Sequence, residues 1–187
     1  AVRQTVVTAR EDRIGDKRLV AYLVANPAAI SGNELEKWKN DQLDQWRDLW
    51  QNAYTEEGTL DPAFNISGWS SSYTGKAIPA AEMREWVETT AAKICAIKAR
   101  RVLEIGSGTG LLVARVAPNC DRYVATDFSP AAIAAIRHLQ SVRDDLSAVD
   151  ARQLTADQLG ELGNERFDLV IVNSVAQYFP DQAYFLT

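Results

Sequence analysis

The stretch that decides the fold is RVLEIGSGTGLLVARVAP, residues 101–118. It predicts a short apolar strand, a glycine loop from Gly106 to Gly110, and then a helix that Pro118 stops. The glycines allow a sharp turn and let a ligand approach the backbone closely. Such a loop between a strand and a helix is typical of a nucleotide-type cofactor site at the carboxyl edge of a parallel sheet.

The same alternation continues after this stretch. RYVAT (122–126) predicts a second strand, PAAIAAIRHLQ (130–140) a helix, residues 148–155 a weaker third strand, and FDLVIVN (167–173) a strong fourth. Near-continuous apolar strands that alternate with helices indicate a parallel sheet covered on both faces. We therefore expect an α/β, Rossmann-like fold whose first four strands can be read in residues 98–187.

Two features of the loop favour a sulfonium cofactor over a dinucleotide. The dinucleotide fingerprint requires a glycine where Leu111 stands, and here the third glycine comes one residue early, at Gly110. The strand also carries Glu104, and a buried carboxylate would repel a pyrophosphate but attract a cation. The pattern of a strand with Glu104 followed by three spaced glycines resembles that of S-adenosylmethionine (SAM)-dependent methyltransferases. It disfavours an NAD-dependent reductase.

Acidic residues that follow the next two strands extend the predicted site. Asp127 ends the second strand, where a carboxylate can accept hydrogen bonds from both ribose hydroxyls, and Phe128 is placed to stack on an adenine edge. Asp157 follows the third strand and is placed to receive the adenine amino group. Asp150 is the competing choice if that strand ends earlier.

The segment NSVAQYFP, residues 173–180, follows the fourth strand at the edge where substrates meet cofactors in such folds. It offers the uncharged polar side chains of Asn173, Ser174, Gln177 and Tyr178. These suit methyl transfer, because the sulfonium donor supplies the driving force and the protein mainly aligns the attack. An α-amine with a pKa of roughly 8 is partly neutral near pH 7, so no strong base is needed.

The residues before the sheet divide into two zones. Residues 1–26 hold two β-branched runs, TVVTARED and KRLVAYLVA, around a polar turn at 13–16, which predicts a half-buried hairpin. Residues 27–97 hold all five Trp residues and predict helices, one capped by Ser31 or Asn33 and one from Ala80. Trp46 and Trp50 belong to an apolar helical stripe. The Ser/Gly-rich loop that carries Trp69 and Tyr73 predicts a lid over the cofactor.

Composition excludes several other classes. The formal net charge of -5 disfavours a nucleic-acid binder, and no apolar run approaches the ~20 residues that span a bilayer. Cys95 and Cys120 form no metal-binding spacing, and His138 is the single histidine, so we expect no metal site. With no secretory signal at the start, we expect a cytoplasmic protein. The missing initial Met suggests a piece of a longer chain.

Four segments, SGWSSSYTGKAIPAAEMREW, RVLEIGSGTGLLVARVAP, YVATDFSPAAI and FDLVIVNSVAQYFP, follow one another in this order. Together they resemble the N-methyltransferase domain embedded in non-ribosomal peptide synthetases. VVTAREDRIGDKRLVAYLVA, residues 6–25, resembles the early C-terminal subdomain of an adenylation domain, into which that family inserts the methyltransferase. Ser107 departs from the family, which often has Cys at this position.

The resemblance implies methyl transfer from SAM to the α-amino nitrogen of an aminoacyl thioester held on the phosphopantetheine of a carrier domain. The rest of the adenylation domain and the synthetase would act in cis, without nucleic acid or membrane partners. The residues implied to face the methyl group and the amine are Tyr73, Gln177 and Tyr178. Those implied to hold the cofactor are Glu104, Gly106, Ser107, Gly108, Gly110, Asp127, Phe128, Ala156, Asp157 and Asn173.

The alternatives are a C- or O-methyltransferase and a non-catalytic SAM-binding module. Glu104 and Asp127 are both present, which argues against a site that has lost its cofactor-binding residues. We also expect residues 1–187 alone to be inactive, because the unpaired apolar edge of the fourth strand would be an aggregation template.

Overall fold

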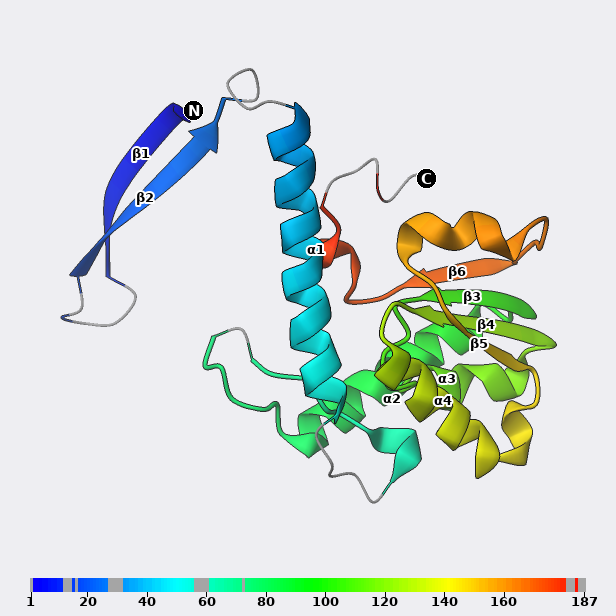
Figure 1. The fold of residues 1–187 in the computed structure, drawn as a ribbon. Helices are drawn as coiled ribbons and strands as arrows, with labels where there is room; N and C mark the ends of the chain where they lie inside the picture. Colours follow the sequence, from blue (N-terminus) through cyan, green and yellow to red (C-terminus); the bar gives the residue numbers. More distant parts are fainter. Residues whose placement is uncertain are drawn as a thin grey trace. The chain divides into compact units, whose positions relative to one another are not determined.

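The computed structural model describes residues 2–11, 15, 17–26, 32–55, 61–71, 73–180 and 184 (Figure 1). The chain separates into two compact units, residues 1–42 and 43–187, which are treated one at a time below. The three segments expected from the sequence, 1–26, 27–97 and 98–187, divide the chain elsewhere, and these boundaries stay predictions.

The first unit contains the predicted hairpin. Strands β1 (Val2–Glu11) and β2 (Lys17–Ala25) pair antiparallel, with Val6 opposite Tyr22. Every residue of β1 is exposed, so the expectation of a half-buried strand is wrong for the part of the chain that the structure describes. The physical reason is that β1 and β2 form a two-stranded sheet. Such a sheet has no second layer that could cover either of its faces. Most of the predicted turn lies outside the described residues.

The second unit is built on a parallel sheet, which confirms the predicted Rossmann-like α/β fold. Its described strands are β3 (Arg101–Ile105), β4 (Arg122–Asp127), β5 (Val149–Gln153) and β6 (Leu169–Val172), arranged in the order β5-β4-β3-β6. The sheet order therefore reverses between β3 and β6. In open α/β sheets a ligand binds at the carboxyl edge beside such a reversal.

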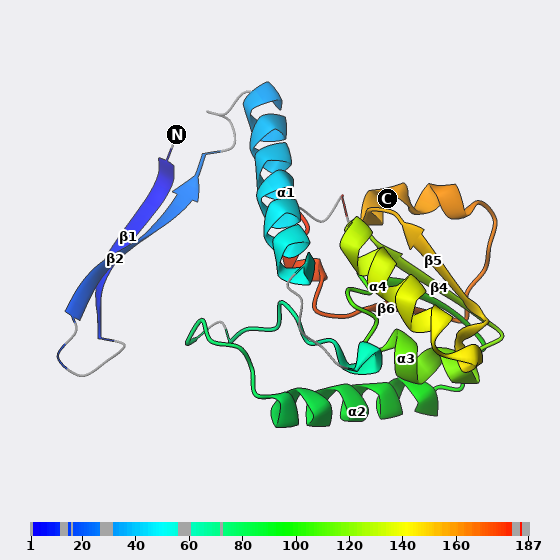
Figure 2. The same cartoon turned by 60° about the horizontal axis from the view of Figure 1, so that its bottom comes forward.

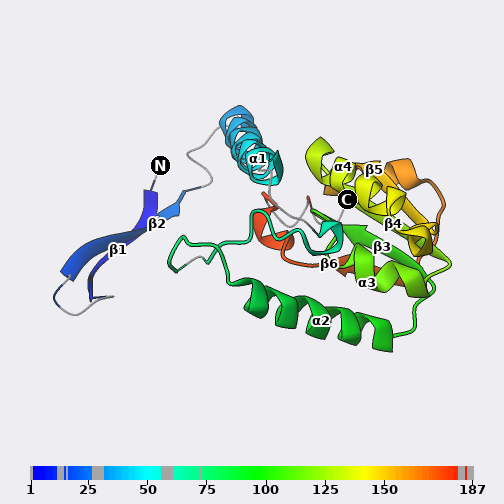
Figure 3. The same ribbon diagram turned by 90° about the horizontal axis from the view of Figure 1, so that it is seen from below.

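Helices cover one face of this sheet, as Figures 2 and 3 show from two sides. They are α2 (Ala80–Ala96), α3 (Val113–Val116) and α4 (Pro130–Ser141). Their apolar side chains join a core that includes fully buried Val113, Tyr123 and Ile136. The other face packs Leu103, Val124 and Leu162 together, beneath the 3-10 helix 156–162.

Two helices differ from their sequence patterns. The segment after the glycine loop forms only a four-residue α-helix, α3, and continues as a 3-10 turn that contains Pro118. Helix α1 runs over Gly32–Thr55, so Ser31, one of the two expected caps, lies outside the described residues and Asn33 lies within the helix. The second half of α1, from residue 43, belongs to the same unit as the sheet.

Candidate functional site

A cavity of about 760 Å³ opens at the carboxyl ends of the parallel strands. This volume lies within the range of roughly 300–1,000 Å³ that is usual for small-molecule sites. Its walls come from the glycine loop, from the ends of β4, β5 and β6, from the loop around Trp69, and from the second half of α1. The site thus draws on segments that lie far apart in the sequence.

The glycine loop is tied tightly to strand β4. The backbone N–H groups of Gly106 and Ser107 both donate to the carbonyl oxygen of Thr126, at 2.8 and 2.9 Å. Gly106 and Gly108 have φ values of 70° and 53°, in the left-handed region that favours glycine. A Cβ on Gly106 would lie 2.3 Å from Val175 Cγ2, so the segment after β6 packs directly on the loop.

Asp127 fixes the other side of the loop. One carboxylate oxygen accepts a 2.8 Å hydrogen bond from Gly108 N–H, and the other accepts 2.9 Å from Ser129 N–H. Burial raises the pKa of Asp127, whereas these two backbone hydrogen bonds lower it. Each carboxylate oxygen can accept a second hydrogen bond, so Asp127 keeps the capacity to bind a ribose.

Glu104 lies at the floor of the cavity and is only 3% exposed. The hydroxyl of Tyr123, itself fully buried, donates a 2.7 Å hydrogen bond to it. Burial raises the pKa of Glu104 to about 8; the Tyr123 hydrogen bond lowers it, and the negative charge of Asp127 raises it further. A cationic group in the cavity would favour the ionised carboxylate.

Most of the side chains predicted from the sequence meet in this one cavity. Its lining includes Tyr73, Glu104, Gly106, Ser107, Gly108, Asp127, Phe128, Ala156, Asn173, Gln177 and Tyr178. Among the described residues, Gly110 and Asp157 are the two predicted site residues that the lining does not include. The roles assigned to all of these residues stay predictions.

Gly110 and Asp157 have other surroundings. A Cβ on Gly110 would lie 3.1 Å from Ile136, so this glycine allows the loop to approach helix α4. The Asp157 side chain hydrogen-bonds with Thr155 and Tyr184, both of which line the cavity. Asp150, the alternative choice for the adenine contact, lies near the start of β5 and is bound instead by Arg122 and Arg152 at 2.7 and 2.8 Å.

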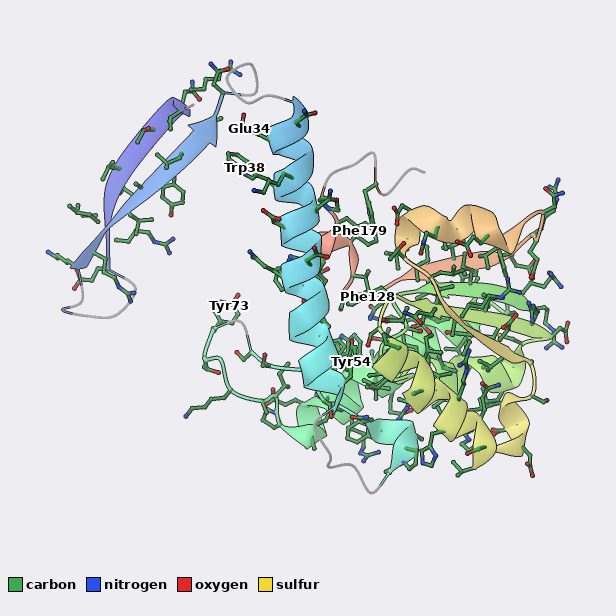
Figure 4. The ribbon with its side chains drawn as sticks, in the orientation of Figure 1. Glu34, Trp38, Tyr54, Tyr73, Phe128 and Phe179 are labelled. Carbon is green, nitrogen blue, oxygen red and sulfur yellow. The ribbon has the colours of Figure 1, made fainter. Side chains whose placement is uncertain are left out.

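The three predicted acceptor-side residues differ in their environment. The side chain of Tyr73 is 97% exposed, and Figure 4 shows it at the tip of its loop, pointing away from the sheet. Gln177 donates a 2.9 Å hydrogen bond to the carbonyl oxygen of Ser174, a residue with a φ of 57°. Tyr178 packs among aromatic rings. The predicted lid role of Tyr73 stays a prediction.

Helix α1 provides an aromatic wall that the sequence analysis did not assign to the site. Trp46, Trp50 and Tyr54 all line the cavity. The rings of Trp46 and Trp50 lie 4.5 and 5.6 Å from the ring of Tyr178, and Trp50 stacks on Tyr54 at 5.5 Å. The signal in the sequence is the recurrence of aromatic residues at every fourth position, which is equally typical of a helix that packs in the core.

A second aromatic pair lies across the loop that precedes α2. The rings of Trp69 and Trp86 are 4.6 Å apart, and both residues line the cavity together with Glu82. The charged side chains among the described lining residues are Glu82, Glu104 and Asp127, all of them acids. The cavity therefore favours a cationic or neutral ligand over one with a phosphate.

Comparison with known proteins shows what this fold and its cavity are similar to. Residues 103–187 match the family of the methyltransferase domain. The structure of magnesium protoporphyrin IX methyltransferase from Synechocystis, solved with bound S-adenosylhomocysteine (SAH), is similar with a TM-score of 0.51 and 16% identity, covering 81% of this chain and 64% of that one. Residues 103–187 are therefore similar to methyltransferase domains, and the second unit has a Rossmann-like methyltransferase fold.

The sequence relatives are much longer proteins than this chain. Chondramide synthase cmdD of Chondromyces crocatus is 45% identical over 90% of this chain. CymA of Salinispora arenicola, described as a probable non-canonical nonribosomal peptide synthetase, is 38% identical over 98% of it. The chain spans about 4% and 2% of the lengths of these two relatives. It is thus similar to a segment of non-ribosomal peptide synthetases, as the sequence resemblance implied.

Two structural features are absent from the described residues. Within them, no helix combines the length and apolar character that a bilayer span requires. The same residues contain no group of three or more His, Cys, Asp or Glu side chains arranged to hold a metal ion.

Proposed function

We propose that this chain belongs to an N-methyltransferase domain that uses SAM to methylate the α-amine of an aminoacyl thioester on a carrier domain. The proposal rests mainly on one observation: an aromatic cavity whose described charged groups are acids lies beside a glycine loop at the switch point of the sheet. Similarity to peptide synthetases supports an amino-acid substrate.

The residues present fit the cofactor. Bound SAM supplies a methyl group activated on a positively charged sulfur. Asp127 would accept hydrogen bonds from the ribose hydroxyls, Phe128 and Ala156 would enclose the adenine, and Glu104 would attract the cationic amino-acid end. The glycine loop allows close approach of the backbone, and the positive φ of Gly106 and Gly108 keeps side chains out of that space.

The segment after β6 would position the acceptor. We propose that Asn173 stands between the cofactor and the acceptor amine, and that Gln177 and Tyr178 orient the amine for in-line attack. The methyl group of SAM would pass from sulfur to the acceptor nitrogen, and the proton released from that nitrogen would go to water. Alignment is the main contribution of the protein in such a step.

The test is a methyl-transfer assay on the intact synthetase module with the carrier loaded with an amino acid. We expect a mass increase of one methyl group, and fragmentation should place it on the α-nitrogen. A methyl group on carbon or oxygen would contradict N-specificity. Failure to bind SAH in calorimetry would overturn the methyltransferase proposal itself, whereas SAH binding without methyl transfer would favour a non-catalytic SAM-binding module.

We also propose that the hairpin of β1 and β2 belongs to the C-terminal subdomain of the adenylation domain. Its apolar side chains are exposed on both faces, including Val6, Val7 and Leu23. Such a surface suits a strand pair that joins a larger sheet in the whole synthetase. Hydrogen exchange on the full synthetase tests this, since the hairpin amides should be protected there; rapid exchange would contradict it.

A further inference from the structure

The hydroxyl of Tyr54 lies directly over the glycine loop. A Cβ placed on Gly108 would be 3.2 Å from this hydroxyl, closer than any other atom. Tyr54 comes from the end of α1 and lines the cavity, next to the sheet in Figure 4. Burial, and then the charge of Asp127, raise the pKa of Tyr54, so its hydroxyl keeps its proton and can donate. The structure gives this hydroxyl no hydrogen-bond partner among the described residues.

The loop itself has few donors left for a ligand. The N–H groups of Gly106 and Ser107 donate to Thr126, that of Gly108 to Asp127, and that of Gly110 to the Ser107 carbonyl oxygen. The side-chain hydroxyls in the loop are also occupied: Ser107 donates to Thr126 at 3.1 Å and Thr109 to Asn65 at 2.6 Å.

This matters for the carboxylate of SAM. If the ribose binds at Asp127 and the amino group at Glu104, as proposed above, the amino-acid end of the cofactor would lie beside the glycine loop. Its carboxylate needs hydrogen-bond donors, since a buried ionised group without them is costly. The described lining contains no Lys or Arg side chain, so the donors must come from neutral groups such as the Tyr54 hydroxyl.

We propose that the Tyr54 hydroxyl binds the α-carboxylate of the cofactor and so makes α1 part of the cofactor site. This proposal rests on the proposed function only in requiring that SAM or SAH binds; it is independent of the acceptor. Tyr54 also stacks on Trp50, and Trp50 contacts Tyr178. The helix therefore touches the cofactor end and the acceptor end of the cavity through neighbouring side chains.

The test compares Tyr54→Phe with the native protein in the intact synthetase module, using two probes. SAH carries the carboxylate, whereas decarboxylated SAH differs only by its loss. We expect calorimetry to show about tenfold weaker binding of SAH to the variant, as expected for a lost hydrogen bond to a charged group. Binding of decarboxylated SAH should be unchanged.

The variant keeps the ring that stacks on Trp50, so its melting temperature without ligand should match the native value. Tyr22→Phe, in the exposed hairpin, is the matched control and should bind both probes normally. Equal weakening of both probes by Tyr54→Phe would overturn the proposal, because the hydroxyl would then contact adenosine or merely hold the loop. Unchanged SAH affinity would also overturn it. If the native protein does not bind SAH, that result would instead contradict the proposed function.

Discussion

Tyr123 and Glu104 form a buried pair on adjacent parallel strands, joined by a 2.7 Å hydrogen bond from the phenol to the carboxylate. Both side chains are almost inaccessible to solvent. The ionisation of Glu104 therefore depends on the ligand in the cavity, since a cation there stabilises the ionised carboxylate.

The first prediction concerns proton release. Because the pKa of Glu104 is raised to about 8, the acid is mostly neutral in the empty site at pH 7 and must ionise to pair with the cofactor ammonium. SAH affinity should therefore rise by up to about tenfold per pH unit below pH 8 and level off above it. Calorimetry in buffers of different ionisation enthalpy should detect the released proton. Glu104→Gln should abolish the release, and the exposed Glu85→Gln should leave it intact.

The same shift affects folding. A carboxyl whose pKa is higher in the folded than in the unfolded state stabilises the fold fully below its unfolded pKa, and this contribution is lost as pH rises through the folded value. The stability of the empty domain should thus fall between about pH 4.5 and pH 8. In Glu104→Gln this part of the fall should disappear. An unchanged pH profile of melting in the variant would show that Glu104 does not titrate in this window.

The second prediction concerns Asp127. Asp127→Ala removes the acceptor for Gly108 and Ser129 as well as the proposed ribose contact, so SAH binding should weaken by about 10- to 100-fold. Asp127→Asn keeps one oxygen and should lie between this variant and the native protein. Asp121→Ala, just before the start of β4 and exposed in an ion pair with Arg100, should bind normally. Normal affinity in Asp127→Ala would remove Asp127 from the site.

The third prediction separates backbone strain from collision at Gly106. Gly106 and Gly163 have similar φ values of 70° and 66°. A Cβ on Gly106 would collide with Val175, whereas a Cβ on Gly163 would have no atom of the described chain within 4 Å. Gly163→Ala should cost about 1–3 kcal/mol of folding free energy, because its backbone at φ 66° and ψ -132° lies outside the regions that other residues adopt. Gly106→Ala should cost about 1–3 kcal/mol more, because Val175 must move. Denaturant unfolding measures both, and equal costs would show that the loop relaxes freely.

The fourth prediction concerns the aromatic wall. Trp46→Ala removes a ring in contact with Tyr178 and should reduce kcat/KM for the loaded carrier by about tenfold, at the upper end of what an aromatic pair contributes. The Kd for SAH should change little, because Trp46 contacts the acceptor side. Trp38→Ala, an exposed position on the same helix, is the control. A larger loss in SAH affinity than in turnover would place Trp46 on the cofactor side instead.

The parallel sheet could be predicted because its signals are local. Strands β3, β4 and β6 are short, mainly apolar runs, and the position of Asp127 at the end of β4 follows directly from its run. Gly106 and Gly108 could be identified for the same reason, since a turn that demands positive φ selects glycine where it occurs. These positions depend little on what packs against them from elsewhere.

The aromatic wall could not be predicted in the same way. The spacing of Trp46, Trp50 and Tyr54 shows which face of α1 is apolar, but not that this face meets Tyr178. Asp157 illustrates the opposite difficulty. Its position after a strand suggests a ligand contact, yet its partners include Tyr184, which is distant from it in the sequence. Long-range packing decides both cases.

The contact between Trp46 and Tyr178 also bears on when the site is formed during synthesis of the chain. Most of the sequence lies between these two residues, so their pairing closes a long loop and carries a large entropic cost until the sheet holds the ends together. A growing polypeptide releases α1 from the ribosome well before β6, and for that interval the aromatic side chains of the helix lack their partner. This exposed stripe is a natural target for a chaperone, and translation pauses before residue 178 would prolong its exposure.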